Sequence, residues 1–119
     1  MKPRFLLDEH INLSVKRGLL RLEPHIEVIR VGDQDAPALG APDAEILEWI
    51  VLNSYILVSE NRRTIPTHLQ AHLAKGLAFP GILWIRPHIR LGQLVEELYL
   101  IWTASEAEEY VGVSAYIPF

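Results

Sequence analysis

The sequence of 119 residues contains no cysteine. Disulfide bonds, thiolate nucleophiles and thiolate zinc sites are therefore excluded, and any metal ligands must come from Asp, Glu, His or Asn side chains. No apolar run approaches the roughly 18 residues of a membrane helix, and residues 1–4 are not followed by the hydrophobic stretch of a signal peptide. We therefore predict a cytoplasmic protein with no membrane partner.

The chain also has fewer basic than acidic residues. The chain has 11 Lys and Arg residues against 15 Asp and Glu residues, a formal net charge of -4. Bulk charge therefore does not favour nucleic-acid binding, which would have to be local or shared with a partner. The sequence also lacks a phosphate-cradling glycine loop and a Gly-x-Ser-x-Gly motif, so nucleotide hydrolysis and serine hydrolysis have no support.

The apolar content suits one folded domain. Hydrophobic residues make up 50% of the chain, and the length fits a single domain over residues 1–119. Short apolar runs predict strands near residues 5–7, 27–31, 55–58 and 81–85. Amphipathic stretches between and after them predict helices over 12–21, 43–51, 64–76 and 91–102. This alternation predicts a three-layer α/β fold with a mostly parallel sheet of about four strands.

Single residues mark the ends of these helices. Asn12 and Asp43 stand where helix N-caps belong, and Gly76 is a C-terminal stop. Ser105 with Glu108 has the spacing of a capping box that restarts a helix, and the tail after it has no assignment.

The last third of the chain has more large apolar side chains than one small sheet needs. We predict that part of this surface meets a second copy of the chain, as a homodimer, or a partner protein. The residues concerned are Leu98, Tyr99, Ile101, Trp102, Tyr110, Tyr116, Ile117 and Phe119.

Acidic residues directly follow the first predicted strand. Asp8 and Glu9 lie at the strand end, which is the edge where open α/β sheets keep their sites. Carboxylate oxygens are the ligands that Mg²⁺ and Mn²⁺ take, and water on such an ion becomes a nucleophile near a phosphate. Asp43 and Glu45 open a helix that follows a strand, so they predict further carboxylates at the same edge. The simpler interpretation is that these acids only cap helices, and the two roles are compatible.

A polar cluster over residues 59–63 closes the third predicted strand. Arg62 and Arg63 are candidates for binding an RNA backbone, since a guanidinium group makes bidentate contacts to phosphate. A salt bridge to Glu60 is the alternative. His68 and His72 lie one helical turn apart, but they lack a third ligand, so a surface pair is favoured over a metal site.

Three segments together resemble the small PIN-like domains of the family DUF5615. They read Phe-Leu-Leu-Asp-Glu near the start, Asp-Ala-Glu-Ile-Leu before a helix and Ile-Leu-Val-Ser-Glu-Asn-Arg-Arg after it. The resemblance spans residues 4–85. It implies a PIN-like fold and Mg²⁺- or Mn²⁺-dependent RNA cleavage, as in the toxin nucleases of type II toxin–antitoxin pairs. The strand-end acid of the family is matched by Asp8 and the helix-opening acid by Asp43, with Glu45 close behind.

The third position departs from the family pattern. After the third strand the family usually shows Thr-x-Asp-x-Asp, whereas Asn61 and Arg63 stand here in place of the two acids. Asn61 can still ligate magnesium through its amide oxygen, but Arg63 cannot ligate a cation.

Three hypotheses follow. The first is a toxin ribonuclease in which Asp8, Asp43 and Asn61 are catalytic, Glu9 and Glu45 complete the metal ligands, and an antitoxin protein is the partner. The second is a catalytically degenerate PIN-like module that binds RNA or a protein without cleaving. The third, a structural partner-binding domain, fits the acidic net charge.

Overall fold

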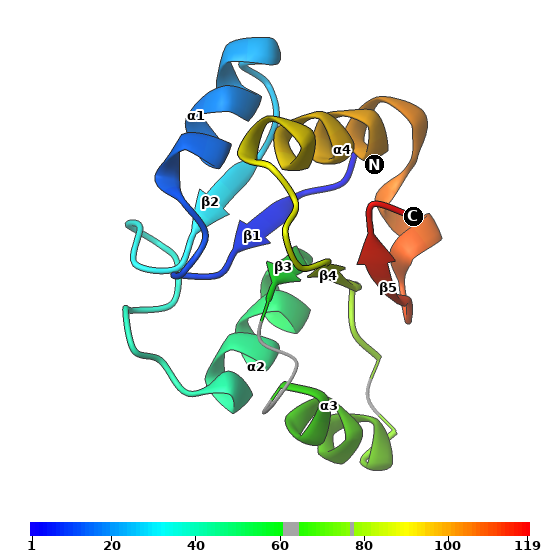
Figure 1. The fold of residues 1–119 in the computed structure, drawn as a ribbon. Coiled ribbons are helices and arrows are strands. Elements are labelled where there is room, and N and C mark those ends of the chain that lie inside the picture. The colour runs from blue at the N-terminus through cyan, green and yellow to red at the C-terminus, as the bar shows by residue number, and fades with distance from the viewer. Residues whose placement is uncertain (61–64, 77) are drawn as a thin grey trace.

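The computed structural model describes residues 1–60, 65–76 and 78–119, apart from the side chains of residues 66, 68, 72 and 73. Strands and helices alternate along the chain (Figure 1). The elements are β1 (Phe5–Leu7), α1 (Leu13–Leu22), β2 (Val28–Arg30), α2 (Asp43–Asn53), β3 (Ile56–Ser59), α3 (Ile65–Ala74), β4 (Ile82–Ile85), α4 (Leu91–Ala104), the 3₁₀ helix η1 (Ala107–Tyr110) and β5 (Ser114–Ile117).

The strands form one parallel sheet in the order β2-β1-β3-β4-β5. Helices α1 and α4 cover one face, and α2 and α3 cover the other (Figure 1). The predicted single-domain, three-layer α/β class is confirmed, with five strands instead of about four. The chain runs from β1 to β2 on one side and then returns to β3 on the other, so the winding reverses between β1 and β3. Doubly wound sheets bind ligands at such a point.

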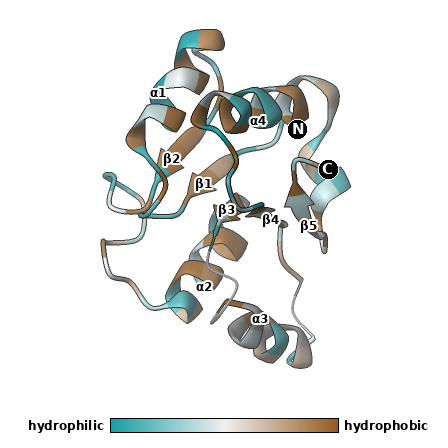
Figure 2. Ribbon diagram, in the orientation of Figure 1, coloured by the Kyte–Doolittle hydropathy of each residue, from teal (hydrophilic) through white to brown (hydrophobic). Residues whose placement is uncertain are grey.

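Successive strand residues serve two separate cores. In β1, Phe5 and Leu7 face α1 and α4 while Leu6 faces α2 and α3, and all three are fully buried. Because helices cover both faces, a strand in the middle of the sheet is apolar at every position. Figure 2 shows β1 in the colours of hydrophobic residues. This is why the sequence signal for these strands was a short apolar run.

The predicted helix ends are largely confirmed. Asn12 caps α1, because its side-chain oxygen accepts a hydrogen bond from the Ser14 N–H at 2.8 Å. Gly76 follows α3 with a φ of 73°, the left-handed conformation that ends many helices. The prediction for Asp43 is wrong by one position, since Pro42 is the N-cap and Asp43 is the first helical residue. There its carboxylate still lies at the positive end of the helix dipole.

The C-terminal segment corrects the sequence prediction. The capping box around η1 is formed by Glu106 and Glu109, while Ser105 is the C-cap of α4. The unassigned tail contains β5, which pairs with β4 at the edge of the sheet. This strand gave no sequence signal because only Ile117 of its four residues is buried.

Much of the apolar surplus in the last third belongs to the core of the chain itself. Leu98, Ile101 and Ile117 are buried on the face that α4 covers. Tyr116 and Phe119 remain 41% and 71% exposed. Self-association therefore has less free apolar surface than the sequence suggested, and it stays a prediction. Among the described residues, no helix has the length and apolar content to cross a membrane.

Candidate functional site at the carboxyl edge of the sheet

Asp8 lies at the point where the sheet reverses, directly after β1. Its backbone N–H donates to the Val58 carbonyl at 3.0 Å, which extends the pairing of β1 with β3 by one residue. Its carboxylate accepts one hydrogen bond from the Glu9 N–H at 2.8 Å and one from the Ser59 hydroxyl at 2.9 Å. The side chain is therefore held by both strands, and the residue is only 8% exposed.

No cationic side chain in the described part of the chain forms an ion pair with Asp8. The two hydrogen bonds stabilise this nearly buried carboxylate, and a bound cation would stabilise it further. The bonds from Glu9 and Ser59 fall on different oxygens, and each oxygen can accept a second bond. With respect to the described residues, each Asp8 oxygen can therefore accept a further bond, and the carboxylate suits a hard divalent cation.

Ser59 belongs to the polar cluster over residues 59–63, but no role of its own was predicted for it. It is the last residue of β3 and is fully buried. Because Leu7 pairs with Val58, the next residues in register are Asp8 and Ser59. A serine that closes an otherwise apolar strand was the available signal, but the strand order was needed to place it beside Asp8.

Glu9 points to a different partner from Asp8. One of its carboxylate oxygens accepts a hydrogen bond from the Gly40 N–H at 3.2 Å, in the segment that leads to α2. Arg30, at the end of β2, donates from Nη2 to the Glu9 carbonyl and from Nε to the Ile11 carbonyl, the latter at 2.9 Å. These bonds fix the loop after Asp8 to β2 and to the segment before Asp43. Glu9 thus positions the loop, whether or not it also contributes to a metal site.

Asp33, in the turn that follows β2, makes a second set of polar contacts near Arg30. Asp33 accepts hydrogen bonds from the Lys16 ammonium at 2.7 Å and from the Arg30 N–H at 2.9 Å. Burial raises the pKa of the Asp33 carboxyl, but the bonds from Lys16 and Arg30 outweigh it, and the net pKa is lowered. The ion pair ties α1 to the turn that follows β2.

Asp43 and Glu45 lie in the first turn of α2. In a parallel crossover the helix runs back against the strands, so the start of α2 lies at the same edge of the sheet as Asp8 (Figure 1). Asp43 is half-buried and Glu45 is exposed. Among the described residues, no group of three or more Asp, Glu or His side chains is close enough to hold a metal ion. The fold brings the predicted acids to one edge without assembling them into a cluster.

Three predicted site residues, Asn61, Arg62 and Arg63, lie outside the described part of the chain, after β3 and Glu60 in sequence. The side chains of His68 and His72, which were predicted to be a surface pair on a helix, also lie outside it.

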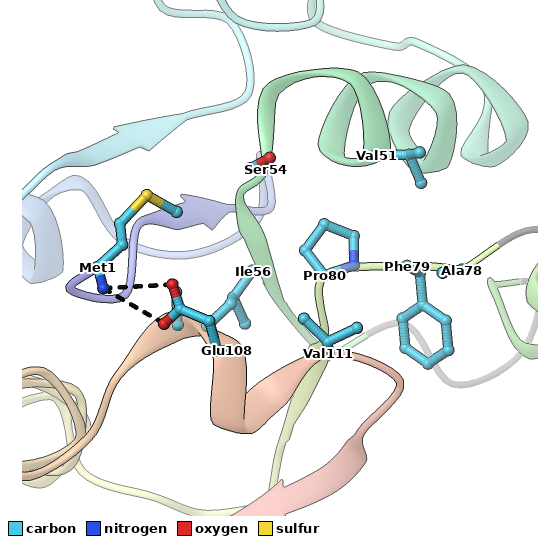
Figure 3. Close-up of a pocket in the computed structure, with 10 residues that line it drawn as sticks. Met1, Val51, Ser54, Ile56, Ala78, Phe79, Pro80, Glu108 and Val111 are labelled. Atoms are coloured by element: carbon cyan, nitrogen blue, oxygen red, sulfur yellow. Dashed lines mark hydrogen bonds and ion pairs between the residues drawn. The ribbon is translucent and has the colours of Figure 1, made fainter.

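Two hollows lie at opposite ends of the strands, which we call the carboxyl edge and the amino edge of the sheet. The one at the carboxyl edge, of about 140 Å³, is lined by residues that include Ile11, Glu60 and Ile85. The other, of about 230 Å³, lies at the amino edge and is largely apolar. Figure 3 shows Val51 and Val111 on its walls, with Glu108 already paired to the amino terminus. Of these two hollows, the one at the carboxyl edge adjoins the loop after Asp8.

No family model, curated protein or solved structure matches this chain. The fold and the site define a doubly wound α/β protein with a buried aspartate at its switch point.

Proposed function

We propose that the chain is a PIN-like, metal-dependent ribonuclease and the toxin component of a toxin–antitoxin pair. The observation that carries the proposal is Asp8, a nearly buried carboxylate that has no cationic partner among the described residues. Its location supports a ligand site, because doubly wound sheets bind ligands at the switch point. The sequence resemblance supports nuclease chemistry at that site.

Asp8 and Asp43 would hold a Mg²⁺ or Mn²⁺ ion, with Glu9 and Glu45 as further candidate ligands. When bound, such an ion polarises a phosphodiester and activates a water molecule. Ser59 orients the Asp8 carboxylate, and Arg30 holds the loop that follows it.

Three residues that follow β3 would contact the attacking water or the RNA substrate. Asn61 would orient the attacking water through its amide, and Arg62 and Arg63 would bind the RNA backbone. The function would place the protein in the cytoplasm together with RNA and an antitoxin protein.

The test is an RNA cleavage assay with and without Mn²⁺. We expect slow, Mn²⁺-dependent cleavage by the wild type, because Asn61 and Arg63 replace carboxylates that would strengthen metal binding. Asp8→Asn should abolish cleavage, whereas the control Glu96→Gln, on the exposed side of α4, should leave it unchanged. Robust cleavage by Asp8→Asn would show that no metal site at β1 is used.

A second candidate function is a module that binds RNA or a protein without cleaving. It is favoured by the absence of a three-acid cluster from the described residues. In that case the wild type should bind RNA without cutting it, and Arg62→Ala should weaken the complex and flatten its salt dependence.

The double change Asn61→Asp with Arg63→Asp separates the two candidates. If the nuclease site is only weakened, metal-dependent cleavage should rise, and adding Asp8→Asn should abolish the gain. If the scaffold serves binding alone, the double change should produce no cleavage.

A further inference from the structure

Helices α1 and α4 lie side by side on one face of the sheet (Figure 1). A groove of about 480 Å³ is lined by residues of both helices. Along α1 the groove extends from Ser14 to Leu22, about two helical turns or 12 Å. Apolar side chains line much of it, and Leu22 and Leu91 are 52% and 41% exposed. The groove is separate from the Asp8 loop.

The groove is basic although the chain is acidic overall. Helix α1 carries three basic residues, Lys16, Arg17 and Arg21, and no acidic residue. Lys16 is paired with Asp33, but Arg17 and Arg21 make no ion pair or side-chain hydrogen bond within the part of the chain that the structure describes. They stand four residues apart on one helix, where like charges repel each other. A bound carboxylate would relieve that repulsion.

Two glycines shape the groove, and one of them is not required by the fold. Gly18 lets the helices approach, because an added Cβ would lie 3.1 Å from a methyl group of Val95. Gly92, in the first turn of α4, faces open space, with no atom within 4 Å of an added Cβ. Because glycine has no side chain, this open position leaves room for the backbone of a partner to approach closely.

We propose that this groove binds an acidic, amphipathic helix from a partner protein. The apolar side chains of the bound helix, spaced by three and four residues, would fill the space over Gly92 and contact Leu22 and Leu91. Its carboxylates would pair with Arg17 and Arg21. A peptide is favoured over RNA because the groove exposes apolar side chains between the two arginines and α4, where an RNA backbone has no complementary group.

The experiment selects ligands without assuming their sequence. A displayed library of random peptides of roughly 16 residues, about four helical turns, is panned against the full chain. Enriched peptides should be acidic and should repeat apolar residues at helical spacing. The affinity of a synthetic copy is then measured by fluorescence anisotropy against the wild type and its variants.

Two independent changes should each weaken binding at least about tenfold, namely Gly92→Trp, which fills the groove, and Arg17→Glu with Arg21→Glu, which reverses its charge. Two controls should stay within about threefold of the wild type. These are Gly92→Ala, which adds one methyl group in open space, and Lys75→Glu, which reverses one positive charge after α3, on the other face of the sheet. Circular dichroism checks that each variant is folded.

Four results would overturn the proposal. They are a selection without binders, enriched peptides without acidic residues, and binding that survives both Gly92→Trp and the arginine reversal. The fourth is evidence that a second copy of the chain or RNA occupies the groove. Sedimentation of a wild-type dimer that Gly92→Trp makes monomeric would assign the groove to a second copy. RNA binding lost in the arginine reversal, with no groove-directed peptide, would assign it to RNA.

Discussion

The two edges of the sheet are built from the same strands but have different chemistry. Strand β3 begins with Ile56, which lines the apolar hollow at the amino edge, and ends with Ser59, which donates to Asp8 at the carboxyl edge. The hollow at the amino edge is lined mainly by apolar side chains, with Glu108 and the amino terminus paired beside it, whereas at the carboxyl edge the nearly buried Asp8 carboxylate lies in a network of hydrogen bonds. We infer that the amino edge stabilises the fold and that the carboxyl edge carries the function.

The largest expected effect on stability lies at the amino edge. Ile56→Ala should lower the free energy of unfolding by about 2–5 kcal/mol, because it removes a buried side chain and leaves a cavity. The matched control Val51→Ala, at a half-exposed wall of the same hollow, should change it by less than about 1 kcal/mol. Urea unfolding measures both. A loss of metal response in folded Ile56→Ala would contradict the separation of the two edges.

At the carboxyl edge, Arg30→Ala should lower the free energy of unfolding by about 1–3 kcal/mol, because two loop carbonyls lose a charged donor. Amide hydrogen exchange should quicken in the loop after Asp8. The control Arg86→Ala removes one exposed bond to the Pro118 carbonyl and should leave that loop unchanged. Unaltered exchange in Arg30→Ala would mean that this guanidinium does not hold the loop.

Two serine substitutions compare the contribution of a single hydrogen bond at each edge. Ser59→Ala removes the donor to Asp8, and Ser114→Ala removes the acceptor that the Trp84 indole N–H contacts at 2.7 Å. Each change should lower the free energy of unfolding by about 1 kcal/mol. Only Ser59→Ala should also alter Mn²⁺ affinity, measured by titration calorimetry. Equal effects of the two serines on affinity would remove the proposed role of Ser59.

The smallest expected effect is the pH dependence that Asp33 contributes. Its pKa is lowered in the folded chain, so ionised Asp33 stabilises the fold above its unfolded pKa of about 3.9. This contribution is lost as the pH falls through the lower folded pKa. Because Asp33 and Lys16 are each about a quarter exposed, it should stay below about 1 kcal/mol. The difference in unfolding free energy between wild type and Asp33→Asn should therefore shrink below about pH 4, and a constant difference would contradict the ion pair.

The central strands and the main helices could be predicted from the sequence because each has a strong local signal. The uninterrupted apolar run in β1 and the cap at Asn12 are examples. Strand β5 could not be predicted, since it is an edge strand that depends on pairing with β4 rather than on its own apolar pattern. Its position explains why Ile117 belongs to the core.

The candidate site was predictable only in part. A strand-end carboxylate such as Asp8 is visible in sequence, because its location follows from the preceding apolar run. The contacts that define its surroundings join distant segments, as in the bonds from Ser59 to Asp8 and from Gly40 to Glu9. These depend on the order of β2, β1 and β3, which no local pattern encodes.

The most direct test of the account is a calorimetric titration of the full chain with Mn²⁺, combined with thermal unfolding. We predict weak binding and a rise in melting temperature for the wild type, because a cation would neutralise the buried Asp8 carboxylate. Both responses should disappear in Asp8→Asn and persist in Glu96→Gln. Identical responses of wild type and Asp8→Asn would contradict the assignment of Asp8 as the centre of the site.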